Sequence, residues 1–179
     1  YNAQAALSEE TSSSLSSSIS TLKTTTLTAL ENKMLSEAEK SSIQVSLNVT
    51  VKEKGEIDAT TAGFVANSNL LNKTLVSTPK GLYDTAYNAL IAAMNDVLDE
   101  PLGQLIADAK ITAVNNSFTT YGTRIAAMRT AFQTAQKAIE TQVQTNADNA
   151  IATALTDYVS LVSYNEDMEA IQSQVDGAI

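Results

Sequence analysis

Carboxylates are the main residues in this chain that suit catalysis or metal binding, because His and Cys are both absent. Their absence removes the usual general base, the thiolate nucleophile and the soft metal ligands, and leaves Asp, Glu, Lys, Tyr and hydroxyl groups. Acidic residues gather at three places in the sequence: Glu9 and Glu10; Asp96, Asp99 and Glu100; and Glu166, Asp167 and Glu169. Carboxylate oxygens of this kind are the ligands that hard cations prefer.

The acidic groups nevertheless do not predict a metal site. The sequence has no D-x-[DN]-x-[DN]-G calcium loop and no Gly-rich loop that would bind phosphate. Solvated helix ends explain the carboxylates better. We therefore expect no catalytic residues, no cofactor-binding residues, no metal ligands and no enzymatic activity.

Aromatic and basic residues provide two further candidates. Tyr83 and Tyr87 lie one helical turn apart, which is compatible with two rings stacked on a sugar. Leu90 prolongs the same stripe, however, so packing in a core is the favoured interpretation. Arg124 and Arg129 flank an apolar face, and we expect them at its edge with buried stems and solvated guanidinium groups.

Composition limits the class of protein. The chain has 179 residues, of which 44% are hydrophobic and 5% aromatic, which is enough for one modest core or an elongated assembly of helices. A net charge of −9 argues against nucleic-acid binding, where Lys and Arg neutralise phosphates. The sequence contains no run of about 20 apolar residues, so we expect no membrane span. It begins at Tyr1 rather than Met, and we interpret it as a soluble piece of a longer chain.

The apolar periodicity predicts an all-α fold with a central three-helix bundle. The expected helices cover about residues 36–66, 82–99 and 112–139, with a connection over 67–81 where Asn, Pro and Gly accumulate. The segment "IQVSLNVTV" at 43–51 alternates as a strand would, but a lone strand would lack partners, so helix is favoured.

The expected core is formed by apolar side chains of the three predicted helices. Ser36 and Glu39 form the S-x-x-E pattern of a capping box at the start of the first helix. Its apolar face is expected to consist of Ile43, Leu47, Val51 and Ile57. The side chains that we expect to be largely buried in the bundle are Leu47, Tyr87, Leu90, Phe118, Met128 and Phe132.

Long helical, coiled-coil-like extensions are expected at both ends, so the predicted domains are 1–34, 35–139 and 140–179. The first contains "SLSSSISTLKTTTLTAL" (14–30), where Ser and Thr favour a helix only if a partner covers it, or else a flexible linker. The last continues the third helix, since no Pro or Gly occurs at 123–176. We expect residues 3–30 to pack antiparallel on residues 140–163; a homotrimeric coil is the alternative.

Four segments, taken in order, resemble minor structural proteins of phages and prophages of Gram-positive hosts, which are large tail-tip or tail-fibre proteins. The segments are "LSEAEK" (35–40), "YDTAYNAL" (83–90), "FTTYGTRIAAMRTA" (118–131) and "IQSQVDGAI" (171–179). The resemblance covers about residues 34–179 and carries no catalytic motif.

This resemblance implies a helical spacer module of the virion tail, with the host-binding or cell-wall-degrading parts elsewhere in the parent chain. The implied partners are other phage tail proteins and copies of the same chain, with no nucleic acid and no small-molecule substrate. Two alternatives remain open. One is a helical ligand-binding sensor domain of a bacterial membrane receptor, and the other is a flagellin-like filament subunit.

Overall fold

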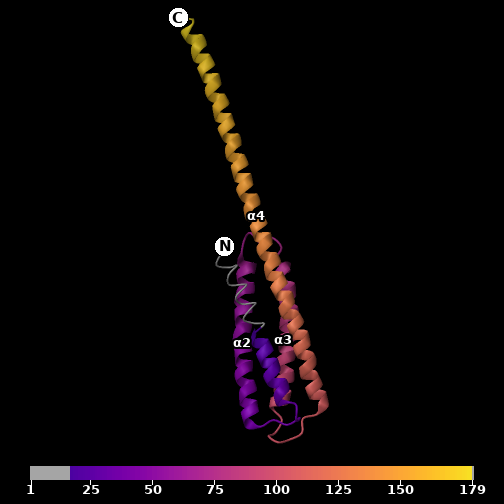
Figure 1. Cartoon of the computed structure of the whole chain (residues 1–179). Coiled ribbons are helices and arrows are strands. Elements are labelled where there is room, and N and C mark those ends of the chain that lie inside the picture. Colours follow the sequence, from indigo (N-terminus) through magenta and orange to yellow (C-terminus); the bar gives the residue numbers. More distant parts are fainter. Residues whose placement is uncertain (1–16, 179) are drawn as a thin grey trace. The chain divides into compact units, whose positions relative to one another are not determined.

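A computed structural model describes residues 17–178, and every regular element in this part of the chain is an α-helix (Figure 1). An N-terminal helix covers residues 17–29. It is followed by α2 (Glu37–Ala66), α3 (Thr74–Leu98) and α4 (Asp108–Asp176). The predicted all-α class is confirmed, and 43–51 lies inside α2 as a helix.

The chain divides into two compact units, Tyr1–Ala138 and Ile139–Ile179, which we call unit 1 and unit 2. The described part of unit 1 holds the N-terminal helix, α2, α3 and the first part of α4. Unit 2 holds the remainder of α4. The domain division predicted from the sequence, with boundaries after residues 34 and 139, stays a prediction.

The core of unit 1 draws on four helices, so the expected three-helix bundle is not confirmed. Leu22, Thr26 and Leu30 of the N-terminal segment are buried, and the Thr26 hydroxyl group contacts the Met94 sulfur of α3 at 4.0 Å. In α2 and α4, Phe64 and Phe132 stack with ring centroids 5.4 Å apart. All six side chains that were predicted to be buried are buried: Leu47, Tyr87, Leu90, Phe118, Met128 and Phe132.

The expected pairing of residues 3–30 with 140–163 would join unit 1 to unit 2 and stays a prediction. Within unit 1, Leu22, Ala29 and Leu30 are buried and Leu27 is half-buried. Within unit 2, Ile151 and Tyr158 remain 67% and 64% exposed. Thr26 is compatible with a core because its hydroxyl group has a partner there. Residues 3–16 of the predicted pair lie outside the described residues.

The predicted core face of α2 is wrong at one position. Val51 is 47% exposed, whereas Thr50 is 0% exposed. A step of three residues from Leu47 keeps Thr50 on the buried side of the helix, and its hydroxyl group donates to the Ser46 carbonyl oxygen at 3.3 Å. Because this hydroxyl is satisfied inside the helix, Thr50 costs little to bury.

Helix α3 begins earlier than expected, since residues 74–81 of the predicted connection are helical. Pro79 lies in the second turn of α3, where it removes one backbone donor. The Asn72 side chain accepts from the Thr74 backbone N–H at 3.1 Å and thereby takes up a free donor of the first turn. Val76 is fully buried, and its packing offsets the cost of the proline.

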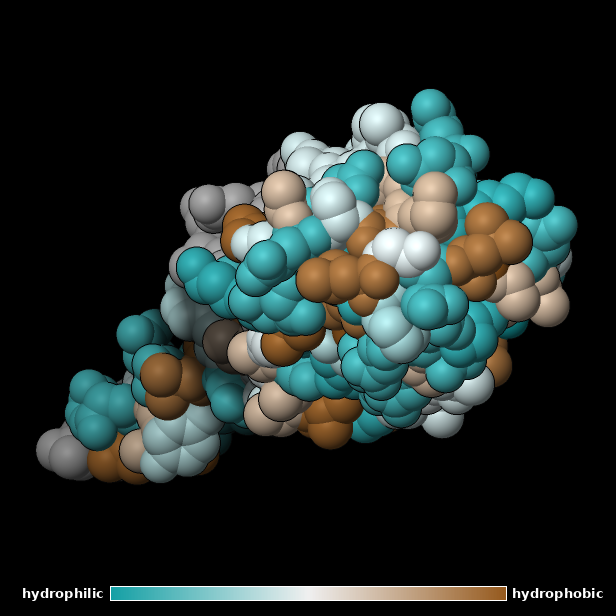
Figure 2. All heavy atoms as spheres, turned by 90° about the horizontal axis from the view of Figure 1, so that it is seen from below, coloured by the Kyte–Doolittle hydropathy of each residue, from teal (hydrophilic) through white to brown (hydrophobic). Residues whose placement is uncertain are grey.

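Two loops meet at one end of unit 1. The capping box at Ser36 and Glu39 is present, as predicted. Lys33, with a φ of 58°, precedes this cap, and its carbonyl oxygen accepts from the Ile106 backbone N–H at 2.7 Å. This bond joins the loop before α2 to the loop before α4. Seen from this end, apolar side chains lie scattered among hydrophilic ones (Figure 2).

Candidate functional site

A polar cluster of four charged side chains joins α2 to α3 in unit 1. Each helix carries a lysine followed four residues later by an aspartate: Lys54 and Asp58 on α2, and Lys80 and Asp84 on α3. Within the helices, the lysine nitrogens lie 2.6 Å from the aspartate oxygens. Between the helices, Lys80 lies 2.7 Å from Asp58 and Lys54 lies 3.4 Å from Asp84. The four charges therefore alternate and neutralise one another.

Three tyrosines lie beside this cluster. The Lys54 nitrogen is 5.4 Å from the centre of the Tyr87 ring, and the Lys80 nitrogen is 5.8 Å from the centre of the Tyr83 ring. The Tyr83 and Tyr121 rings are 5.4 Å apart, and their hydroxyl oxygens are 2.8 Å apart. Both lysines thus make cation–π contacts in addition to their ion pairs. The arrangement ties α2, α3 and α4 together.

The pKa shifts of Lys54 and Asp58 favour the charged form of each side chain. Burial raises the pKa of Asp58, but hydrogen bonds and attraction from Lys54 and Lys80 outweigh it and lower that pKa. Burial lowers the pKa of Lys54, but Asp58 and Asp84 outweigh it and raise that pKa. Burial is the main cause that raises the pKa values of the three neighbouring tyrosines, Tyr83, Tyr87 and Tyr121. These shifts move the pKa values of Asp58, Lys54 and the three tyrosines away from pH 7, so none of these five groups suits proton exchange at neutral pH.

The residues singled out from the sequence are distributed between the core and the surface. Tyr83 and Tyr87 are buried, which confirms core packing over sugar stacking. Arg124 and Arg129 are half-buried at the edge of the α4 face, as predicted. Glu9 and Glu10 lie outside the described residues.

The acidic group at the end of α3 is held by a lysine. The Lys110 nitrogen lies 2.7 Å from Glu100 and 3.2 Å from the Asp96 carbonyl oxygen. The group at Glu166, Asp167 and Glu169 is exposed in unit 2. Among residues 17–178, no three acidic residues are arranged to hold a metal ion.

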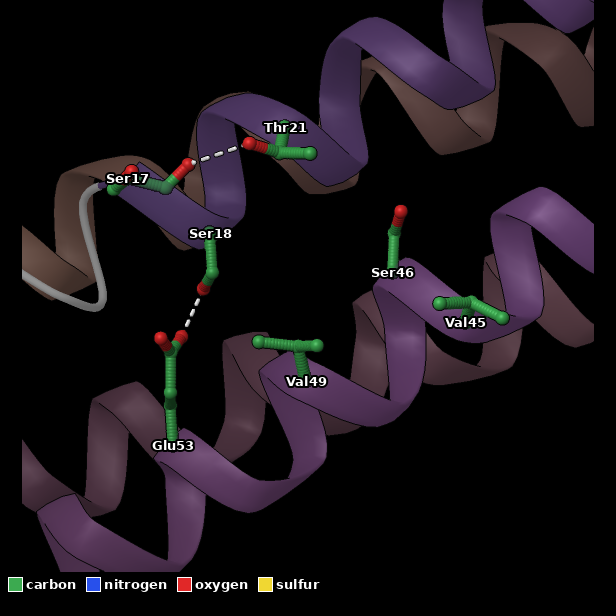
Figure 3. Close-up of a pocket in the computed structure, with 7 residues that line it drawn as sticks. All are labelled: Ser17, Ser18, Thr21, Val45, Ser46, Val49 and Glu53. Atoms are coloured by element: carbon green, nitrogen blue, oxygen red, sulfur yellow. Dashed lines mark hydrogen bonds between the residues drawn. The ribbon is translucent and has the colours of Figure 1, made fainter.

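A surface hollow of about 510 Å³ lies between the N-terminal helix and α2 (Figure 3). Four hydroxyl side chains line it, together with two valines of α2 and one carboxylate. Ser18 points across the hollow and donates to the carboxylate of Glu53, which is only 6% exposed. The hydroxyl-bearing residues are Ser17, Ser18, Thr21 and Ser46.

The hollow explains part of the Ser/Thr-rich sequence. Thr21 donates its hydroxyl to the Ser17 carbonyl oxygen at 3.1 Å, so this side chain is satisfied within its own helix. Because Glu53 is also bonded, these polar groups serve the contact between the two helices. Sequence reasoning missed Glu53 and the four-charge cluster. The signals were a charged residue three positions after Thr50 on the core face and two Lys–Asp pairs at i,i+4 spacing.

Comparison with known proteins adds no family, because no family model, curated protein or solved structure matches this chain. Within residues 17–178, no helix is long and apolar enough to cross a lipid bilayer. The four charges of the cluster pair with one another between α2 and α3, and Ser18 bonds to Glu53 across the hollow, so both features join neighbouring helices.

Proposed function

We propose that this chain is a structural, non-catalytic spacer module of a phage or prophage minor structural protein, in the tail tip or a tail fibre. In this proposal the module positions host-binding or cell-wall-degrading parts that lie elsewhere in the parent chain. It works in the virion tail, after synthesis in the bacterial cytoplasm. Its partners are other tail proteins and, through other parts of the parent protein, copies of the same chain.

The observation that carries the proposal is the helix of unit 2. The part of α4 in residues 139–176 corresponds to about 57 Å of helix at 1.5 Å per residue. Between Val143 and Val175, every large apolar side chain except the half-buried Val162 is exposed. An isolated helix of weak formers is marginal in water. A helix with this character suits a component that is built into a larger assembly.

Unit 1 supports the same proposal through the direction of its polar groups. Ion pairs join the lysines to the aspartates in the cluster of Lys54, Asp58, Lys80 and Asp84. The Tyr83 and Tyr121 hydroxyl groups form a hydrogen-bonded pair. Ion pairs and hydrogen bonds between helices resist separation of the helices and provide no reactive group. These contacts are expected in a rigid spacer that holds neighbouring domains in position.

The location of the protein tests the proposal. Antibodies raised against the purified chain are applied to particles and cells of the source strain after prophage induction, and gold labels are located by electron microscopy. We expect labels at one end of the phage tail. Labels along flagellar filaments would favour the flagellin-like alternative, and labels confined to the cell envelope would favour the sensor domain; either result would contradict the proposal. Particles from a strain with the coding segment deleted serve as the control.

A further inference from the structure

Between residues 143 and 175 of unit 2, five large apolar residues lie on a seven-residue repeat, whereas six others lie off it: Val143, Leu155, Val159, Val162, Tyr164 and Ile171. Steps of four and three residues connect Ala147, Ile151, Ala154, Tyr158 and Leu161, and the same series continues through Asn165, Met168, Gln172 and Val175. We call these nine positions the seam. All nine are exposed in the structure. A seam of this period is the pattern by which one helix packs along another.

Charge is distributed very unevenly along the chain. Unit 2 contains no lysine or arginine, although the whole chain has 11. Unit 2 contains seven of the 20 acidic residues: Glu140, Asp148, Asp157, Glu166, Asp167, Glu169 and Asp176. Most of the net charge of −9 therefore belongs to unit 2.

Four of these carboxylates lie directly beside the seam. Asp148, Glu169 and Asp176 each follow a seam residue on one side, and Asp157 precedes a seam residue on the other. In helix pairs these flanking positions set the choice of partner through ion pairs across the interface. Every charge that unit 2 presents there is negative.

From the seam and its flanks we infer that unit 2 docks an amphipathic helix of a different protein chain, with Lys or Arg beside its apolar positions. A basic-flanked helix gains ion pairs with the flanking carboxylates in addition to the apolar contact. A second copy of this helix gains none, since in parallel register Asp157 would face Val162 and Tyr164 would face Glu169. Two copies would also bring two strongly acidic helices together. The inference deepens the proposed function by giving the chemical class of its partner.

Two synthetic helical peptides of about five heptads test the inference on the full chain. Both carry the same Ile and Leu seam, but one has Lys and the other Glu at the flanking positions. We expect the Lys peptide to bind at least ~10-fold more tightly in fluorescence anisotropy, and to weaken between ~50 mM and ~300 mM salt as the charges are screened. Equal affinity of the two peptides would overturn the inference.

Matched variants show whether the seam is the surface that binds. Leu161→Asp changes a seam residue that is 57% exposed, and Val159→Asp changes an off-seam residue that is 56% exposed. Both add one negative charge to the same turn of helix. We expect the first to abolish binding of the Lys peptide and the second to preserve it; equal effects would contradict docking at the seam.

The mass of the chain without peptide tests whether a second copy of the chain covers the seam. Sedimentation equilibrium should give 19.0 kDa, the mass of one chain. A stable multiple of this mass, lost in Leu161→Asp, would mean that copies of this chain cover the seam and would overturn the inference. These outcomes are independent of where gold labels fall on particles, so failure of the docking inference and failure of the proposed function are distinguishable.

Discussion

The hydroxyl oxygens of Tyr83 and Tyr121 lie 2.8 Å apart in the core of unit 1, so each phenol is the hydrogen-bond partner of the other. Tyr83 comes from α3 and Tyr121 from α4, and both side chains are 0% exposed. Water cannot replace a lost partner at such a site without disturbing the packing. The pair therefore makes the contact between α3 and α4 sensitive to single changes.

Replacement of one tyrosine by phenylalanine tests this pair. Tyr83→Phe leaves the Tyr121 hydroxyl group buried without its partner, and should lower the free energy of unfolding by about 1–3 kcal/mol. The double variant Tyr83→Phe with Tyr121→Phe should cost less than the sum of the single changes, since neither orphaned hydroxyl remains. Urea unfolding followed by circular dichroism measures both. Tyr158→Phe, at an exposed position in unit 2, is the control.

Phe132 connects α4 to α2 through its stacked contact with Phe64. Phe132→Ala removes a fully buried ring and leaves a cavity, so the free energy of unfolding should fall by about 3–5 kcal/mol. Leu71→Ala changes a residue that is 74% exposed and should have an effect within about 0.5 kcal/mol. A loss below about 1 kcal/mol for Phe132→Ala would show that this layer is not part of the stable core.

The free energy of unfolding should depend on the ionisation of Asp58 at acidic pH. Its pKa is lowered in the folded chain by Lys54 and Lys80, so its stabilising effect is present above the unfolded pKa of about 3.9. That effect is lost as the pH falls through the lower, folded pKa. Asp58→Asn should reduce the slope of stability against pH in this acidic range, measured by urea unfolding. A residual slope is expected from Glu39, whose pKa is lowered by hydrogen bonds from Ser36.

The control for this acid effect is Asp148→Asn, which removes an equal charge from unit 2, outside the cluster. It should leave unfolding of unit 1 unchanged at every pH. An unchanged slope in Asp58→Asn would show that the four-charge cluster does not contribute to folding.

Hydrogen exchange should distinguish the two units. Amide protons near Met94 and Met128 lie in a buried core and should exchange only through large openings of unit 1. The helix at 139–176 is exposed on nearly every side chain, so its amide protons should exchange much faster in the isolated chain. Mass spectrometry of exchanged peptides measures both. Equal protection of the two units in the monomer would contradict the account of unit 2.

The sequence indicates the helices well because α2 and α4 contain few helix-breaking residues. Prediction from the sequence fails where a polar side chain is buried in the core or where a proline lies inside a helix. Thr26 and Thr50 are buried although they are polar, because each hydroxyl group has a hydrogen-bond acceptor. The acceptor is the Met94 sulfur for Thr26 and the Ser46 carbonyl oxygen for Thr50. Pro79 indicates a loop by local rules, but the buried Val76 keeps α3 helical there.

The candidate site was less accessible from the sequence. Lys54 with Asp58, and Lys80 with Asp84, each resemble an ordinary solvent-exposed i,i+4 pair. Only the packing of α2 against α3 brings the two pairs together. The charges on one helix give no sign of which second helix they will meet, so such a cluster becomes visible only with the fold.

Replacement of unit 1 in the parent protein tests the spacer proposal most directly. Residues 17–138 are exchanged in frame for an unrelated four-helix bundle that leaves the helix of unit 2 intact, and the infectivity of the resulting phage is compared with that of a simple deletion. We predict infectivity close to wild type for the exchange and a severe loss for the deletion, because position rather than a reactive site is what unit 1 supplies. An exchange as defective as the deletion would contradict the account and would show that unit 1 carries a specific site.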